Sequence, residues 1–157
     1  MGQFPITRTT TPKAKPADDS LSFGKVTTDH MFLMNYAEGK GWFDPRIVPY
    51  GPISLDPATS VLHYGQAIFD GLKAFRGDDG QIRLFRADRH AQRFNRSAKL
   101  MSMPELPVDL IRESFDALVG VDADWVPHKA GTSLYLRPTI IATDVMLGVH
   151  PSHNYLY

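Results

Sequence analysis

Tyr135 and Arg137 are the residues whose types and spacing most clearly suggest chemistry. They lie two positions apart in an apolar segment, residues 133–138, so in an extended strand they share one face while the intervening leucines point to the other. A guanidinium held among leucine, isoleucine and valine needs an anionic partner, because an unpaired buried charge is costly. That partner is either a structural aspartate or glutamate of the chain or the carboxylate of a bound ligand.

Arg93 is a second candidate, because one guanidinium can hold two phosphate oxygens through parallel hydrogen bonds. It lies in a predicted helix of about 16 residues that Asp88 is placed to cap. One side of this helix is apolar and consists of Ala91, Phe94, Ala98 and Met101. The other side carries Arg89, Arg93, Arg96 and Lys99. Taken alone, this basic side is more typical of a solvated helix face than of an anion site.

Composition restricts the possible functions. The 157 residues, 43% of them hydrophobic, suffice for one ordinary core. Seventeen basic and seventeen acidic residues cancel, so we expect neither nucleic acid nor a membrane surface as a partner. No apolar run could span a bilayer, and we expect no secretory signal and a cytoplasmic protein. The absence of cysteine excludes thiolate sites, and His150 and His153 lack a third ligand nearby, so no metal site is expected.

The N-terminal third is predicted to begin with a flexible tail. Residues 1–20 mix Thr, Pro, Lys and Asp with few apolar side chains, which favours disorder. Residues 21–157 are expected to form one domain. Residues 21–36 alternate well enough for one or two strands, whereas glycines and prolines mark residues 39–57 as a long connection with short extended pieces at 47–48 and 53–55.

The remaining elements follow from local patterns. Residues 60–71 are predicted to form a short helix ended by Gly71. A hairpin with strands at 72–76 and 82–85 precedes the basic helix, and a further helix is predicted over 108–121. Residues 132–143 are expected to form one strand and 154–157 the start of another. The predicted fold class is therefore α/β in the α+β sense, a mainly antiparallel sheet flanked by helices.

Four separated segments together resemble a known family. They are FGKVTTDHM at 23–31, LHY at 62–64 with FDGLKAF at 69–75, RLFR at 83–86 with Arg93 and RSA at 96–98, and WVP at 125–127 with SLYLRP at 133–138 and LGV at 147–149. Their order and spacing resemble the smaller N-terminal domain of branched-chain amino acid aminotransferases, which are pyridoxal-phosphate enzymes of fold type IV. The resemblance covers the chain from about residue 21 onward.

The resemblance implies a role for each candidate residue. The counterpart of Arg93 grips the phosphate of pyridoxal 5'-phosphate. The substrate pocket is lined by the counterparts of Phe23, Tyr64, Phe69, Tyr135, Arg137, Leu147 and Val149. Those of Tyr64, Leu147 and Val149 reach in from the partner subunit, which implies a homodimer. The equivalent of Arg137 receives the distal carboxylate of glutamate or 2-oxoglutarate in the pocket that also accepts leucine, isoleucine or valine.

The resemblance also implies that essential groups lie outside this sequence. In the family, the lysine that forms the Schiff base with the cofactor belongs to a C-terminal domain. None of the lysines present matches it: Lys13, Lys15, Lys25, Lys40, Lys73, Lys99 and Lys129. We therefore expect no catalytic residue within the chain, and we expect the isolated chain to be an inactive fragment. Asp70 departs from the family pattern, where glutamate is expected.

Three alternatives remain at this point. A D-amino acid aminotransferase or an aminodeoxychorismate lyase would share the fold with different pocket residues. A non-catalytic dimerising or ligand-binding domain would retain the scaffold without the catalytic half. The WVP segment and the pairing of Tyr135 with Arg137 favour the branched-chain transaminase, which moves the amino group of leucine, isoleucine or valine to 2-oxoglutarate.

Overall fold

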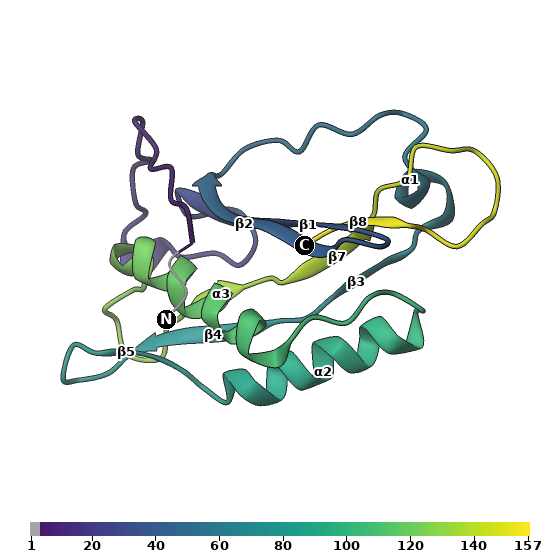
Figure 1. Cartoon of the computed structure of the whole chain (residues 1–157). Helices are drawn as coiled ribbons and strands as arrows, with labels where there is room; N and C mark the ends of the chain where they lie inside the picture. The colour runs from purple at the N-terminus through teal and green to yellow at the C-terminus, as the bar shows by residue number, and fades with distance from the viewer. Residues whose placement is uncertain (1–3) are drawn as a thin grey trace.

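The computed structural model describes residues 4–157, and its strands form two antiparallel sheets (Figure 1). The larger sheet has the order β2-β1-β8-β7-β3. Its strands are β1 (His30–Ala37), β2 (Gly41–Pro49), β3 (Ala67–Phe69), β7 (Thr139–Ala142) and β8 (Asn154–Leu156). The smaller sheet has the order β5-β4-β6. Its strands are β4 (Leu72–Arg76), β5 (Ile82–Leu84) and β6 (Leu134–Leu136). The predicted α+β class with a mainly antiparallel sheet is confirmed.

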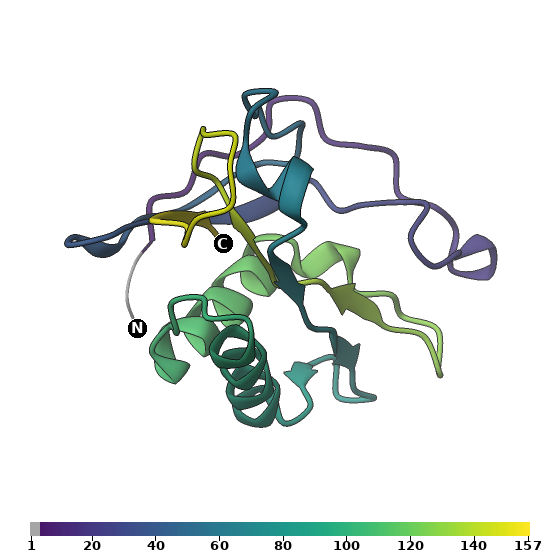
Figure 2. The ribbon, with the colours of Figure 1, turned by 90° about the vertical axis from the view of Figure 1, so that its right-hand side faces the viewer.

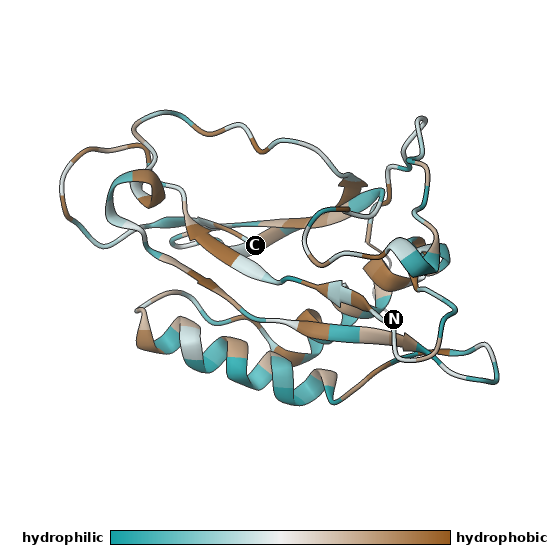
Figure 3. Ribbon diagram, turned by 180° about the vertical axis from the view of Figure 1, so that it is seen from behind, coloured by the Kyte–Doolittle hydropathy of each residue, from teal (hydrophilic) through white to brown (hydrophobic). Residues whose placement is uncertain are grey.

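Two helices, α2 (Ala87–Leu100) and α3 (Val108–Val121), pack together on one side of the sheets (Figures 1 and 2). Their apolar sides meet the strands in a single core, and the outer side of α2 is hydrophilic (Figure 3). The core includes Phe94, Ile111, Phe115, Ile140 and Met34. Two short 3-10 helices, η1 (Asp18–Ser20) and η2 (Ala123–Trp125), are also present. None of the helices within residues 4–157 is long and apolar enough to cross a membrane.

The α3 helix and the β4–β5 hairpin lie where the sequence predicts them. Helix α2 also lies where the sequence predicts it, but its first turn differs from the prediction. The residue before the first turn is Arg86, with a φ of 53°, and its side chain makes no capping hydrogen bond. Asp88 instead lies in the first turn, where its carboxylate faces the positive end of the helix dipole. Met101, predicted to be part of the buried stripe, is 43% exposed because the helix ends at Leu100.

The segment 60–71 is not one helix. Helix α1 covers only Ser60–Tyr64 and ends at Gly65, whose φ of 65° permits a left-handed C-cap with its N–H donating to the Val61 carbonyl at 3.0 Å. Residues Ala67–Phe69 then form β3, which pairs with β7. Gly71, the predicted end of the helix, follows this strand instead.

The segment 132–143 is divided between the two sheets. Strand β6 ends at Leu136 and pairs with β4, whereas β7 begins at Thr139 and pairs with β3 and β8. Pro138 has no N–H to donate to a ladder, so it interrupts the strand. This interruption leaves Arg137 at the junction of the two sheets rather than inside one of them.

The predicted connection 39–57 contains a full strand, β2, which pairs with β1 along Gly41–Pro49. A register shift between Leu33 and Asn35, together with Asp44 at a φ of 57°, accommodates Pro45 in this strand. Strand β8 confirms the predicted strand at 154–157 and lies in the middle of the large sheet, between β1 and β7.

The N-terminal segment lies along β2 and the end of α3. Ile47 accepts a hydrogen bond from Thr7 N–H and donates one to the Pro5 carbonyl, both at 2.9 Å. Further along, Lys13 N–H donates to the carboxylate of Asp29 at 2.9 Å. The sequence predicts a flexible tail over residues 1–20 and one domain over 21–157, and both stay predictions. Residues 1–3 of that tail lie outside the described part of the chain.

Candidate functional site

The Arg137 guanidinium lies on an aromatic surface. Its central carbon is 4.4 Å from the centroid of the Phe69 ring, and its Nε and Nη2 donate to the Tyr135 hydroxyl at 3.3 and 3.1 Å. The predicted neighbourhood of Tyr135 and Arg137 is therefore present. The expectation of a buried arginine is wrong, because the strand ends at Leu136 and the Arg137 side chain projects from the sheet junction into solvent. Within residues 4–157, no carboxylate forms an ion pair with this guanidinium.

The Tyr135 ring is in close contact with two neighbouring residues. The ring of Phe23 packs edge-on against it with centroids 4.9 Å apart. The Tyr135 ring also lies directly against Gly71. A Cβ atom built at Gly71 would lie 2.5 Å from Cζ and 2.8 Å from Cε2 of this ring, and closer still to its hydroxyl oxygen. The structure thus brings together Phe23, Phe69, Tyr135 and Arg137, which we call the arginine cluster.

Arg93 is held next to this cluster by Asp70. Arg93 Nε donates to Asp70 Oδ2 at 2.9 Å, and Arg93 Nη2 donates to Asp70 Oδ1. Asp70 is only 7% exposed, whereas the Arg93 side chain is 53% exposed. The Asp70 N–H also donates to the Pro138 carbonyl at 3.0 Å. Asp70 therefore connects helix α2 to the segment that carries Arg137.

The electrostatics favour a charged pair. Burial raises the pKa of the Asp70 carboxyl, but hydrogen bonds from Arg93 and the Gly71 N–H, and the positive charge of Arg93, lower it by more. Its net pKa lies below the usual 3.8. The hydrogen bonds from Arg93 to Asp70 raise the pKa of the Arg93 guanidinium. At neutral pH the pair is therefore fully ionised.

Tyr64 belongs to a second group. Its hydroxyl accepts a hydrogen bond from the Gly148 N–H at 2.6 Å. Leu147 and Val149 flank that glycine and project outward, with Val149 90% exposed. Within residues 4–157, no ring contact, hydrogen bond or ion pair joins Tyr64, Leu147 or Val149 to the arginine cluster. The structure therefore places the predicted substrate residues in two groups.

Asp144 fixes the loop that carries the second group. Its carboxylate accepts hydrogen bonds from the His153 N–H at 2.8 Å and the Asn154 side-chain amide at 2.6 Å, and lies 3.2 Å from His150 Nε2. The other ring nitrogen of His150 is 2.8 Å from the Gly148 carbonyl. Burial raises the pKa of Asp144, but these hydrogen bonds lower it by more, so the net pKa lies below 3.8.

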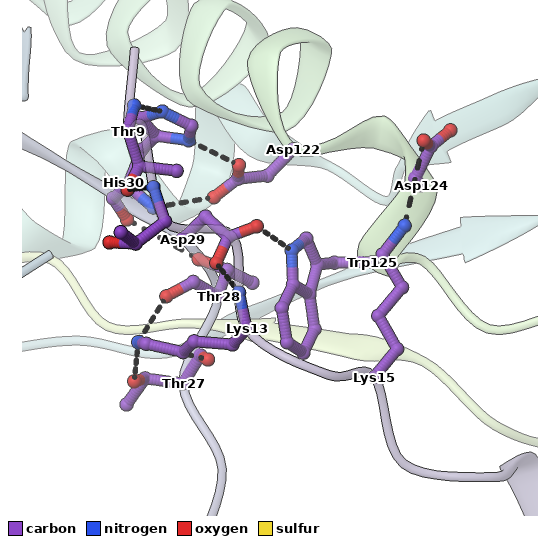
Figure 4. A network of polar contacts seen from close by, with 11 residues as sticks. Thr9, Lys13, Lys15, Thr27, Thr28, Asp29, His30, Asp122, Asp124 and Trp125 are labelled. Carbon is purple, nitrogen blue, oxygen red and sulfur yellow. Dashed lines mark hydrogen bonds and ion pairs between the residues drawn. The ribbon is translucent and has the colours of Figure 1, made fainter. Parts of the chain in front are cut away.

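A cavity of about 440 Å³ between the N-terminal segment and α3 contains none of the predicted site residues. Figure 4 shows its polar lining. His30 Nε2 accepts a hydrogen bond from the Thr9 N–H at 3.0 Å, and His30 Nδ1 lies 2.6 Å from Asp122 Oδ1. Because Nε2 is an acceptor, the proton of the neutral ring is on Nδ1, which donates to Asp122. Asp29 accepts hydrogen bonds from Lys13 N–H and from the Trp125 indole at 3.0 Å. Every one of these groups is satisfied by another part of the chain, which is typical of a structural network.

The sequence does not identify the partners of the site residues. In the sequence, Asp70 is notable only because the family pattern has glutamate there. Gly71 is notable only as the predicted end of a helix. The ion pair between Asp70 and Arg93 spans 23 positions, so no local spacing signals it. The one available signal is the Asp-Gly dipeptide itself, since a glycine after a strand often marks a close approach of another group.

The comparisons with known proteins point to one family, although no family model matches the chain. The chain is 54% identical over 145 residues to branched-chain-amino-acid transaminase 1 of Bacillus subtilis (strain 168), covering 92% of this chain and 41% of that protein. It is 48% identical over 160 residues to the branched-chain-amino-acid aminotransferase of Mycobacterium tuberculosis (strain ATCC 25618 / H37Rv), covering 99% of this chain and 44% of that protein. The chain thus spans about two fifths of the length of these curated relatives.

Solved structures agree in fold. The branched-chain amino acid aminotransferase from Escherichia coli matches with a TM-score of 0.58 and 25% identity, covering 80% of this chain and 39% of that chain. The T.th. branched-chain amino acid aminotransferase complexed with N-(5'-phosphopyridoxyl)-L-glutamate matches with a TM-score of 0.56 and 22% identity, covering 78% of this chain and 39% of that chain.

Proposed function

We propose, from the premise that this chain belongs to the branched-chain aminotransferase family, that it supplies the phosphate-binding arginine and part of the substrate pocket of a branched-chain transaminase. The proposed reaction is the reversible transfer of the amino group of leucine, isoleucine or valine to 2-oxoglutarate. The Schiff-base lysine belongs to the part of the relatives that this chain does not span. The chain alone is therefore proposed to be inactive, and the cytoplasmic location expected from the sequence is part of the same proposal.

The residues present fit the phosphate of pyridoxal 5'-phosphate. Arg93 uses its Nε and Nη2 for Asp70, and its Nη1 donates no hydrogen bond within residues 4–157. The side chain is half exposed, so Nη1 can donate to an anion in solution. When bound, pyridoxal phosphate supplies the electron-withdrawing ring on which transamination depends. The solved T.th. relative in complex with a phosphopyridoxyl compound supports this cofactor.

The arginine cluster carries the substrate proposal. A transaminase of this type must bind an apolar side chain in one half-reaction and an acidic one in the other. The Phe69 and Phe23 rings offer apolar surface, and the Arg137 guanidinium lies over the Phe69 ring with no ion-pair partner among the described residues. Burial of a branched side chain contributes about 1.5–3 kcal/mol, and a hydrogen bond to a charged group contributes about the same. Both kinds of substrate can therefore be accommodated.

The separation of the two groups supports a homodimer. Within the described residues, Tyr64, Leu147 and Val149 form no ring contact, hydrogen bond or ion pair with the arginine cluster of their own chain, although they are exposed and largely apolar. We propose that they complete the pocket of a second copy, as the family resemblance implies. Large exposed apolar side chains are typical of a surface that another molecule covers.

Replacement of Arg137 by alanine tests the substrate assignment in the complete enzyme. The Michaelis constant for glutamate or 2-oxoglutarate is expected to rise at least tenfold more than that for the branched substrates, because a hydrogen bond to a charged group contributes about 1.5–3 kcal/mol. Arg83→Ala is the matched control, since Arg83 is an exposed arginine that pairs with Asp79 on the hairpin. Equal losses for acidic and branched substrates would contradict the assigned role.

A further inference from the structure

Asp70 is the buried carboxylate nearest to the proposed cofactor-binding arginine, and it touches only one edge of that arginine. Both of its oxygens accept hydrogen bonds from the Nε and Nη2 edge of Arg93. Arg93 Nη2 also lies 3.1 Å from His90 Nδ1 and 3.5 Å from the Gly71 carbonyl. Neighbours within the described residues thus occupy one side of the guanidinium, and the Nη1 side is left for an incoming group.

The backbone of Asp70 is fixed as firmly as its side chain. Its N–H donates to the Pro138 carbonyl, and one of its own carboxylate oxygens accepts the Gly71 N–H. The carboxylate therefore cannot follow Arg93 if that side chain moves. A flexible arginine with many rotamers loses most of its conformational freedom when it is held by a fixed bidentate partner.

We propose that Asp70 is a positioning residue that fixes the Arg93 guanidinium so that its Nη1 edge faces the cofactor phosphate. This inference rests on the proposed role of Arg93 as the phosphate ligand. It deepens that role by separating two effects of the carboxylate. As a negative charge, Asp70 repels a phosphate. As a fixed partner, it keeps the arginine in place for that phosphate.

These two effects predict opposite results for Asp70→Asn, which keeps the shape of the side chain and removes its charge. If only charge mattered, the variant would bind pyridoxal phosphate more tightly. If positioning dominates, binding becomes weaker, by roughly tenfold, which is the lower end of what outer partners of a metal-binding residue contribute. Asp70→Glu retains the charge and can still pair with Arg93, so it is expected to recover most of the lost affinity.

The experiment is a spectroscopic titration of the full-length apoenzyme with pyridoxal phosphate and, separately, with pyridoxal, which lacks the phosphate. The expected result is that Asp70→Asn weakens binding of pyridoxal phosphate about tenfold and leaves pyridoxal binding unchanged. In the Arg93→Ala background, Asp70→Asn is expected to cause no further loss of affinity, because Asp70 has no arginine left to position and only its repulsion of the phosphate is removed. Equal or tighter binding of pyridoxal phosphate by Asp70→Asn would overturn the inference.

Arg93→Ala separates this inference from the function on which it rests. If Arg93→Ala leaves the preference for pyridoxal phosphate over pyridoxal intact, then the proposed role of Arg93 is wrong. If Arg93→Ala removes that preference while Asp70→Asn retains it, only the positioning role fails. Should Asp70→Asn not fold, Asp70→Ser, which also removes the bidentate partner of Arg93, provides the same test. A smaller loss than for Arg93→Ala, confined to the phosphorylated ligand, supports positioning, and unchanged affinity for both ligands refutes it.

Discussion

Gly71 is the position where the structure makes the sharpest stability prediction. Its φ lies outside the left-handed region, so alanine can adopt the same backbone and any cost must come from contact. An added Cβ would lie 2.5 Å from Tyr135 Cζ, whereas ordinary contact begins at 3.4 Å. The ring of Tyr135 must therefore move away from Gly71 by at least about 0.9 Å at Cζ, and its hydroxyl oxygen, which lies closer, by more.

The expected cost follows from packing. Inserting a methyl group into an occupied space costs about 1–3 kcal/mol. Tyr135 is only half-buried, so its ring can move outward, and we expect Gly71→Ala to lower the free energy of unfolding by about 1–2 kcal/mol. For a chain of this length that corresponds to a decrease of about 2–8 °C in Tm. The displaced phenol would also lose its hydrogen bonds to Arg137, which weakens binding of an acidic substrate.

Urea unfolding of the full chain measures this cost, with Gly120→Ala as the matched control. Gly120 lies in α3 with nothing within 4 Å of an added Cβ, so alanine there is expected to stabilise by about 0.5–1 kcal/mol. A double-mutant cycle with Tyr135→Ala isolates the contact. If Gly71→Ala costs the same with and without the Tyr135 ring, or costs nothing in the parent protein, the steric argument is refuted.

Two further predictions concern the core and the pH dependence of stability. Asn95, 8% exposed, donates to the Leu106 carbonyl at 2.6 Å and accepts the Leu106 N–H at 3.0 Å. Asn95→Ala should lower the free energy of unfolding by about 2–4 kcal/mol in chemical denaturation, because two buried backbone groups lose their partners. The pKa of Asp144 in the folded state lies below 3.8. The ionised carboxylate therefore contributes fully to the free energy of unfolding above pH about 4, and this contribution is lost as the pH falls through the folded-state pKa. Asp144→Asn should therefore reduce stability at pH 7 and flatten the acid unfolding curve below pH about 4, and an unchanged curve would contradict this assignment.

Elements with strong local signals could be predicted from the sequence. The apolar spacing of α3 and the turn residues of the β4–β5 hairpin act within a few positions, and both elements lie where expected. Strand β2 could not be predicted, because Pro45 and the nearby glycines are typical of a loop. In the structure, the pairing with β1 and a bulge at Asp44 accommodate that proline within a strand. The break in the strand after Leu136 could not be predicted for a similar reason, because the apolar residues on both sides of Pro138 are typical of one continuous strand.

The candidate site divides in the same way. The neighbourhood of Tyr135 and Arg137 follows from a spacing of two, and the structure contains it. The exposure of Arg137, its stacking on Phe69 and the partner of Arg93 depend on how two sheets and a helix meet. Those contacts join positions far apart in the sequence, so only the three-dimensional arrangement determines them.

The central place of β8 has a consequence for how the chain folds during synthesis. Among residues 4–157, the β1–β2 hairpin and the β3–β7 pair are joined in the large sheet only through β8, and the pairing of Asn35 with Leu156 spans most of the chain. Until the ribosome releases residues 154–156, the inner edges of β1 and β7 have unpaired backbone groups. Such edges are sites of intermolecular pairing. A nascent chain that pauses shortly before this strand would therefore be prone to aggregate, and chaperone binding would be most useful there.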